Sequence, residues 1–239
     1  MNPLELTGRT WQHVVQPEGM RCALHRDAVA PFMAMRTAAA REGIDLEAAS
    51  AFRHFDRQRE IWNAKFRGER PVLDADGRPL EALALSEAAR IDAILQWSAL
   101  PGASRHHWGT DLDVIDRAAM APGYVVGLTN DEYMAGGVFG NLNAWLDRHM
   151  RRFGFYRPYA TGTGGVRPEP WHLSYAPIAR RATMELDLAT LAEALLGQGV
   201  AGENEILARL PGIHRRYVRT VDAPPRMRSR WARRHKPVG

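Results

Sequence analysis

Residues 104–113 read Ser-Arg-His-His-Trp-Gly-Thr-Asp-Leu-Asp, and this stretch decides the fold around it. Glycine tolerates a positive φ, so Gly109 allows a sharp turn. The alternating polar and apolar residues that follow are typical of a strand with a two-residue period. Asp111 and Asp113 then lie on one face of that strand. The stretch therefore offers an imidazole, His106, and a carboxylate, Asp113, that can point back toward it.

A second cluster, Glu169-Pro170-Trp171-His172, lies further along the chain. The proline keeps the backbone at Glu169 extended, and residues 171–175 are typical of a strand. Two histidines and one aspartate make a three-ligand site with an open position, which is the arrangement of a catalytic zinc. The sequence therefore indicates that His106, Asp113 and His172 bind one metal and that Glu169 is left free as a general base.

Such a site predicts hydrolysis. Zinc lowers the pKa of a bound water to about 7, and Glu169 can take the proton and pass it to a leaving amine. The oxyanion that forms needs a cation or hydrogen-bond donors beside it, and Arg53, at the end of a predicted strand over 46–51, is the candidate. The alternative is that these side chains are ordinary surface residues and local caps, the usual fate of such residues.

The motifs resemble those of a known family. Ser104-x-His106-x-x-Gly109-x-Asp111-x-Asp113 is similar to the Ser-x-His-x-x-Gly-x-Ala-x-Asp signature of the D-alanyl-D-alanine carboxypeptidases of the vancomycin-resistance (VanY-like) type, which belong to the LAS zinc metallopeptidases. Glu169-x-Trp171-His172 resembles the family's Glu-x-Trp-His. Ser50-Ala51-Phe52-Arg53, followed by Gln58, is similar to its Ser-Gly-Tyr-Arg segment and the glutamine after it. The three motifs occur in the family's order, over roughly residues 25–176.

The resemblance implies a role for each matching residue. It implies Zn²⁺ as the cofactor, with His106, Asp113 and His172 as ligands, Glu169 as the base and Arg53 against the scissile carbonyl; Gln58, Ser104 and Trp171 are the implied substrate contacts. His107 does not match a ligand, because Gly109 fixes the register on His106. Asp111 departs from the small residue of the pattern; its carboxylate either tunes a ligand from behind or faces solvent.

The implied function is zinc-dependent hydrolysis of a peptide bond in peptidoglycan stem peptides, as a D-alanyl-D-alanine or L,D-carboxypeptidase acting on peptidoglycan or muropeptides. One alternative is a lysin-like endopeptidase, which needs a groove open at both ends. Another is a non-catalytic zinc-containing binding module, against which Glu169 and Arg53 argue. This substrate class predicts a place at the cell envelope. No secretory signal and no membrane span are visible in the sequence, so an intracellular role on wall precursors stays open.

The predicted fold is α+β, with a central, mostly antiparallel sheet that carries the ligands and helices packed on it. We expect a zinc peptidase domain over 1–185, in which an insertion at 67–103 forms part of the groove, and a helical C-terminal extension over 186–239. The expected helices are 27–42, 56–66, 86–97, 140–152, 186–196 and 203–210, and the expected strands are 46–51, 110–115, 124–126, 155–159 and 171–175. Asp56 and Ser86 are the expected caps of two helices, and Pro31 is expected in a first turn.

Composition adds few constraints. Hydrophobic residues make up 45% and charged residues 25%, as in an ordinary globular protein. Cys22 is the only cysteine, so an internal disulfide is excluded. From Pro211 onward nine Arg and Lys stand against one Asp, a net charge of +8; the whole chain carries +5, so the remainder is at −3. This basic tail is suited to an anionic polymer or a membrane surface, or is simply a solvated end; we do not expect nucleic acid to be the partner.

Overall fold

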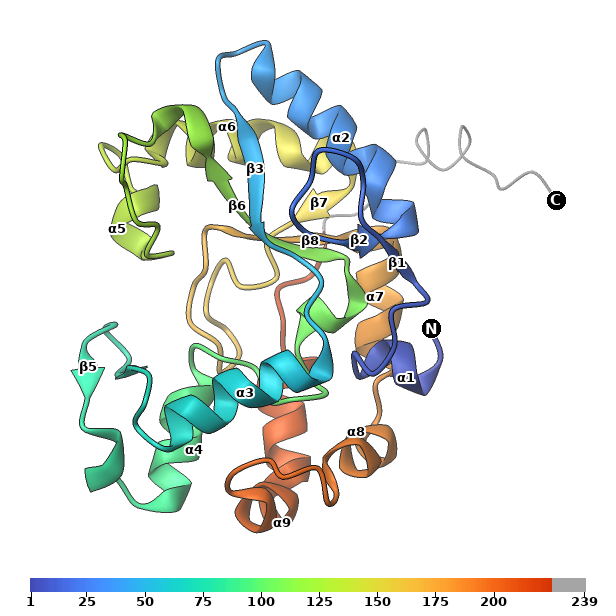
Figure 1. The fold of residues 1–239 in the computed structure, drawn as a ribbon, viewed down its shortest axis with the longest axis vertical. Coiled ribbons are helices and arrows are strands. Elements are labelled where there is room, and N and C mark those ends of the chain that lie inside the picture. Colours follow the sequence, from blue (N-terminus) through green and yellow to red (C-terminus); the bar gives the residue numbers. More distant parts are fainter. Residues whose placement is uncertain (225–239) are drawn as a thin grey trace, which may run out of the picture.

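The computed structural model describes residues 1–224 and is built on a four-stranded sheet (Figure 1). Its strands are β3 (Leu46–Ser50), β6 (Asp111–Asp116), β8 (His172–Tyr175) and β7 (Phe155–Tyr156), in the order β3-β6-β8-β7. Every neighbouring pair is antiparallel. The sheet and the helices that pack on it confirm the α+β prediction.

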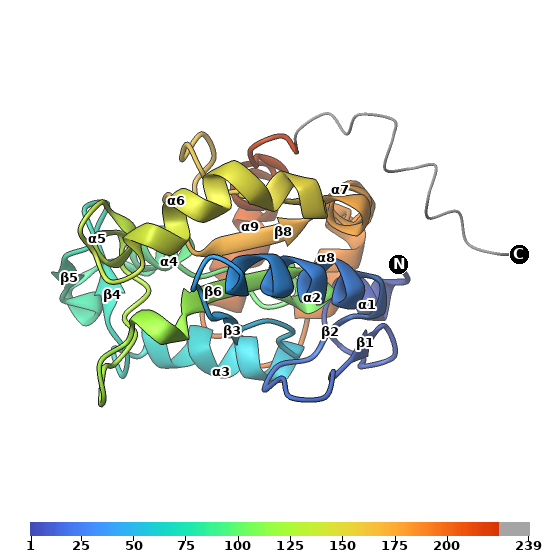
Figure 2. The ribbon, with the colours of Figure 1, turned by 90° about the horizontal axis from the view of Figure 1, so that it is seen from above.

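One face of the sheet is apolar and is covered by α2 (Arg26–Ala40) and α6 (Gly140–His149), which lie over the strands in the view from above (Figure 2). The inward face of α2 consists of Ala28, Phe32, Met35 and Ala39, as its spacing predicts. These side chains share a core with Leu112, Val114 and Leu173 of the sheet. The opposite face of the same strands therefore carries the polar residues Asp111, Asp113 and His172.

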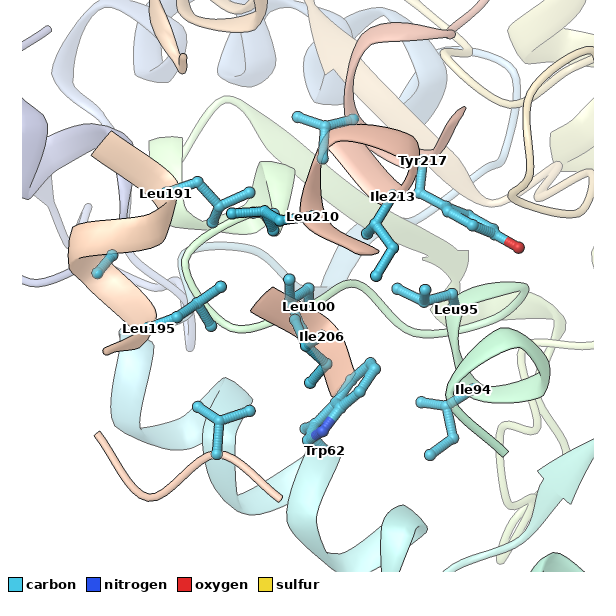
Figure 3. Packing of buried hydrophobic residues seen from close by; sticks show 14 of the residues in the cluster. Trp62, Ile94, Leu95, Leu100, Leu191, Leu195, Ile206, Leu210, Ile213 and Tyr217 are labelled. Atoms are coloured by element: carbon cyan, nitrogen blue, oxygen red, sulfur yellow. The ribbon is translucent and has the colours of Figure 1, made fainter. Parts of the chain in front are cut away.

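A second core lies at the end of the molecule away from α2 and α6 (Figure 1), and part of it is shown from close by in Figure 3. It joins α3 (Phe55–Phe66), α4 (Glu87–Leu95), α7 (Ala176–Glu185), α8 (Leu188–Leu195) and α9 (Glu203–Ile213). Trp62 lies in it, and its indole N–H donates to the Ala201 carbonyl at 2.9 Å. Residues from both sides of the expected boundary after residue 185 belong to this one cluster. The division into two domains stays a prediction.

Smaller elements complete the described chain. They are α1 (Pro3–Leu6), the strand pair β1 (Val14–Val15) and β2 (Leu24–His25), the pair β4 (Val72–Leu73) and β5 (Pro79–Leu80), and α5 (Asn130–Tyr133). Short 3₁₀ turns lie at Ala82–Ala84, Arg105–Trp108, Arg117–Ala119 and Met150–Phe153, and a π-helical turn spans His214–Arg219. None of the helices in residues 1–224 is long and apolar enough to span a bilayer. Most of the predicted basic tail, residues 225–239, lies outside the described residues.

Several local predictions were wrong. Pro31 lies in the second turn of α2, where the burial of neighbouring side chains outweighs one lost backbone hydrogen bond. The cap of α3 is His54, whose ring accepts from the Asp56 N–H, and not Asp56 itself. Residues 124–126 form no strand, because they have no neighbouring strand to pair with. β7 stops at Tyr156, well before the predicted end at 159.

The C-terminal helices also differ from prediction. α7 was not predicted, because its buried face consists of the small residues Ala176, Ala179, Ala182 and Thr183 and not of large apolar side chains. The helix expected from 186 begins at Leu188, after the cap Asp187. α9 continues to Ile213, three residues beyond the expected end, although Pro211 lies inside it.

Candidate metal centre and active site

Strand pairing brings two of the predicted ligands together. In the register of β6 and β8, Asp113 lies directly opposite His172, and side chains opposite each other in an antiparallel pair have Cβ atoms about 5 Å apart. The 3₁₀ turn that carries His106 ends at Gly109, whose φ is +65°. Through this turn the His106 ring comes to lie over the same point. One ligand atom from each of the three side chains lies within 4.8 Å of the other two.

Each imidazole is oriented by a hydrogen bond at its outer nitrogen, the ring nitrogen that faces away from the other candidate ligands. His106 Nδ1 donates to the Ala51 carbonyl at 2.9 Å, so Nε2 keeps the lone pair and faces Asp113 at 3.4 Å. His172 Nε2 lies 3.0 Å from the Asp111 carboxylate, and its Nδ1 lies 3.5 Å from Asp113. The two inner nitrogens therefore converge on the Asp113 carboxylate. Such outer partners are what fixes the tautomer of a metal-binding histidine.

This donor set fits a zinc ion. Two imidazole nitrogens and one carboxylate oxygen are zinc ligands in sites that keep a coordination position open. Asp113 Oδ1 is buried and has no hydrogen-bond partner within the described residues, as expected of an atom that awaits a cation. Burial disfavours the charged form of Asp113, but His106, His172 and Arg53 hold its pKa well below the ordinary value. The carboxylate is therefore ionised and ready to bind a metal.

Glu169 lies at the edge of this centre. Its Oε2 is 3.0 Å from His172 Nδ1, and its backbone N–H donates to the Tyr159 carbonyl. Burial alone would lower the pKa of His172, but its hydrogen bonds to the carboxylates of Asp111 and Glu169 raise it. The side chain of Glu169 thus lies beside the candidate ligands, where a general base would be placed.

Arg53 follows β3 and is held by its neighbours. Its guanidinium donates to Gln58 Oε1 at 2.8 Å and to Ser50 Oγ at 3.0 Å, and its backbone N–H donates to the His106 carbonyl. Gln58 is fully buried, and its amide also donates to the Ala99 carbonyl. Gln58 therefore lies behind Arg53 and positions it, while its implied contact with substrate stays a prediction.

His107 is occupied by the backbone. Its Nδ1 donates to the Arg53 carbonyl at 2.6 Å, and its Nε2 accepts from the Gly102 N–H at 3.0 Å. Burial lowers the pKa of His107 to about 3, so the ring is neutral. With both nitrogens used, His107 is not part of the metal centre, in agreement with the register that Gly109 indicates.

A buried ion pair lies directly behind the centre, and its arginine was not foreseen as a functional residue. Arg105 Nε donates to Asp111 at 2.7 Å, and its other nitrogens donate to Thr183, Tyr156 and Ser174 at 2.7 to 3.1 Å. Asp111 is completely buried, so it does not face solvent. The sequence signal was present: a carboxylate on the inward face of a strand needs a cation, and Arg105 is in the same motif.

The centre opens into a cavity of about 410 Å³. Arg53, Glu169 and the three candidate ligands line it, together with Ser104 and Trp171, two of the implied substrate contacts. The segment 67–103 contributes Arg70, Leu73 and Trp97 to its wall. The cavity therefore brings three candidate metal ligands, a glutamate and an arginine together within one concave space.

Comparison with known proteins now identifies the family. The family model described as VanY, D-alanyl-D-alanine carboxypeptidase, matches residues 21–178. The chain belongs to this VanY family. A Haemophilus influenzae protein described as uncharacterized is 41% identical over 103 residues, which are 42% of this chain and 70% of that protein. A D-alanyl-D-alanine carboxypeptidase of Enterococcus faecalis is 31% identical over 144 residues, 59% of this chain and 44% of that protein.

Three solved structures, two of them of VanY proteins, share the fold. VanYB in complex with D-alanine-D-alanine has a TM-score of 0.50 and 23% identity, over 77% of this chain and 88% of that one. A VanY D,D-pentapeptidase mutant in complex with Zn(II) also has a TM-score of 0.50, with 24% identity over 78% and 92% of the two chains. The LdcB LD-carboxypeptidase has a TM-score of 0.50 and 21% identity, over 77% and 78%.

Proposed function

We propose that this VanY-family protein is a zinc-dependent peptidase that removes the C-terminal residue of a peptidoglycan stem peptide, by D,D- or L,D-carboxypeptidase action. The observation that carries the proposal is the placement of Glu169 at 3.0 Å from His172, beside three side chains whose ligand atoms lie within 4.8 Å of one another. A metal-binding module without catalysis needs neither this carboxylate nor Arg53 in its cavity.

The zinc would be held by His106 Nε2, His172 Nδ1 and the Asp113 carboxylate. When bound, it supplies Lewis acidity, which lowers the pKa of water and polarises a carbonyl. A related VanY structure is a Zn(II) complex, which supports the choice of metal.

The chain's own residues would carry the proton and the charge. Glu169 takes the proton of the attacking water and then gives it to the amine of the leaving residue. Arg53 donates to the oxygen of the scissile carbonyl as negative charge develops on it. The clamp of Gln58 and Ser50 on the guanidinium fixes the direction of that donation. Ser104 and Trp171 line the same cavity and would contact the peptide.

The relatives support the substrate class. The VanYB structure contains D-alanine-D-alanine, and the LdcB structure is described as revealing peptidoglycan recognition. Because these chains share less than 25% identity with this one, they support the kind of substrate and leave the bond cleaved, D,D or L,D, to experiment.

The test is hydrolysis of synthetic stems by zinc-loaded protein, with products read by mass. We expect a single released C-terminal amino acid from pentapeptide or tetrapeptide stems, loss of activity with chelator, and no activity in Glu169→Gln, which keeps its zinc. Internal cleavage would instead favour the endopeptidase. Zinc binding without hydrolysis of any stem would reject a peptidase role.

We also propose that the basic tail is an accessory contact with an anionic polymer of the envelope, the compartment that the substrate class indicates. Removal of residues 225–239, which carry six of the chain's cations, would then weaken binding to such a polymer at low salt and leave peptide hydrolysis unchanged. Equal binding by the truncated chain would contradict this proposal.

A further inference from the structure

Lys65 lines the cavity but has no role in the proposed chemistry. Lys65 lies on α3, and both Ile61 and Lys65 of this helix line the cavity. Lys65 is seven residues, about two helical turns, beyond Gln58, the residue that holds Arg53. Residues spaced in this way share one face of a helix, so Arg53 and Lys65 border the same side of the cavity.

The Lys65 ammonium has no ion-pair partner among residues 1–224. The ion pairs of α3 use the exposed arginines Arg57 and Arg59. Within the described residues, no carboxylate lies within ion-pair distance of Lys65 or of Arg70, a second cation that lines the cavity. Lys65 is half-buried, and leaving a cation there without a partner costs free energy. Lys65 is also the only lysine in residues 1–224, since the chain's other lysine is Lys236.

The charge balance of the cavity favours an anionic ligand. In the part of the chain that the structure describes, Arg53, Lys65 and Arg70 all lack an acidic partner within ion-pair distance. Arg105, which also borders the cavity, is neutralised by Asp111. The acidic groups that line the cavity are Asp113 and Glu169, the first of which would be used by the metal. Burial lowers the pKa of Lys65 to about 8, while Glu169 opposes this, so the ammonium persists at neutral pH.

We propose that Lys65, with Arg70 beside it, binds the free α-carboxylate of the residue that the enzyme releases. The helix points its side chains back toward its N-terminus, so the lysine reaches from its own turn toward Arg53. An extended residue spans about 3.5 Å, so the terminal carboxylate lies one residue beyond the carbonyl that Arg53 would contact. This assignment rests on the proposed function. It makes the enzyme an exopeptidase through charge recognition.

The experiment compares one pentapeptide stem as the free acid and as the C-terminal amide. We expect the wild type to prefer the acid. In Lys65→Met, kcat/KM for the acid falls roughly tenfold to a hundredfold through KM, and the amide is unaffected. Lys65→Arg, which keeps the charge, retains the preference. Arg57→Met removes an exposed cation from the same helix and serves as the matched control, with both substrates unchanged.

Two further readouts separate this role from a structural one. An unpaired, half-buried charge destabilises the fold, so Lys65→Met should raise the melting temperature as it lowers the preference for the acid. In the wild type, KM for the acid should rise above about pH 8 as Lys65 loses its proton, and KM for the amide should not. The second readout needs no variant, so it holds even if a substitution prevents folding.

Equal cleavage of acid and amide by the wild type would overturn the assignment and leave the proposed function intact. An equal loss of kcat/KM on both substrates in Lys65→Met would also overturn it. If the wild type cleaves neither substrate, the proposed function fails. Calorimetry with zinc-loaded Glu169→Gln then decides the assignment alone, since the acid must bind more tightly than the amide.

Discussion

Asp111 stands where the family signature has a small residue, and its surroundings explain how the chain tolerates a carboxylate there. The carboxylate accepts from Arg105, Thr110, Ser174 and His172, all within 3.1 Å. Arg105 supplies the compensating charge, and the indole of Trp108 lies under its guanidinium at 4.7 Å. The pair is therefore fully hydrogen-bonded, and it fixes which nitrogen of His172 faces the metal centre.

Substitutions can separate the two roles of Asp111, which are to neutralise Arg105 and to orient His172. Asp111→Ala leaves Arg105 buried and unpaired, and we expect it to cost about 3–5 kcal/mol of unfolding free energy. Adding Arg105→Met removes the stranded charge and should recover most of that loss. Zinc affinity, measured by competition with a chelating dye, should stay roughly tenfold to a hundredfold weaker in both variants, because His172 Nε2 has lost its acceptor.

The matched control for this pair is Asp116→Asn in the same strand, whose carboxylate accepts from backbone N–H groups away from the metal centre. It should bind zinc as the wild type does. Normal zinc affinity in the double variant would show that Asp111 has no part in orienting His172.

His13 predicts a loss of stability in acid. Its Nε2 donates to the His107 carbonyl at 2.8 Å, and its Nδ1 is buried without a partner in the described residues. Burial lowers the pKa of His13, and the same cause lowers that of His25. The unfolded chain then binds more protons than the folded one below the ordinary value of 6.5, so stability is complete above that pH and falls as the pH decreases.

Each such histidine contributes a slope of up to about 1.4 kcal/mol per pH unit. We expect urea unfolding midpoints to drop between pH 7 and pH 5, and to drop less in His13→Gln. Parallel pH profiles for the two proteins would rule out a neutral, buried His13 as the cause.

Among the elements of the fold, a strand pair and a turn bring the candidate metal ligands together. The register of β6 and β8 sets Asp113 opposite His172, and the turn at Gly109 sets the position of His106. This turn is tightly enclosed: a Cβ on Gly109 would lie 2.6 Å from a methyl group of Val14 and 2.7 Å from the backbone nitrogen of His25. The β1–β2 pair therefore leaves no space for a side chain there.

Gly109→Ala tests this turn. Gly43 has a similar positive φ of +80° but nothing within 4 Å of an added Cβ, so Gly43→Ala is the matched control. In Gly43→Ala the free energy of unfolding should fall by only about 1–2 kcal/mol, which is the cost of the left-handed conformation for a residue with a side chain. In Gly109→Ala the free energy of unfolding should fall by clearly more than this, and zinc affinity should also fall because His106 is displaced. Equal effects of the two substitutions on unfolding and zinc binding would contradict this account.

For the molecule as a whole, the C-terminal helices are part of the support for the cavity. Ile206 of α9 is fully buried in the cluster that also contains Trp62 of α3 and Leu100, which precedes the motif at residues 104–113 (Figure 3). α3 in turn carries Gln58 and Lys65. Residues beyond 185 thus stabilise the helix that borders the site.

Ile206→Ala should reveal this coupling. Truncating this buried side chain should lower the free energy of unfolding by about 2–5 kcal/mol. Unfolding should remain one transition, seen at the same denaturant concentration by circular dichroism and by loss of zinc. If residues 186–239 form an independent unit, the variant would instead show an early separate transition while zinc stays bound.

The sequence by itself determined the local features. Side-chain alternation gives β6, the spacing of Ala28, Phe32 and Met35 gives α2, and Gly109 gives the turn, because each depends only on neighbouring residues. It also provided the three candidate metal ligands through two motifs, and a third motif provided Arg53. It failed where the signal was weak or misleading, as at α7, whose buried face is small, and at Pro31, whose cost is overcome by packing.

The tertiary structure alone decided which side chains meet. No local pattern encodes the contacts that join distant parts of the chain. Examples are the pairing of β6 with β8, the ion pair of Arg105 with Asp111, and the hydrogen bond from Arg53 to Gln58. The isolation of Lys65 in the cavity belongs to the same class, since a missing partner is visible only once every neighbour is placed. Long-range packing fixes these distances, and distances of a few ångströms determine the chemistry.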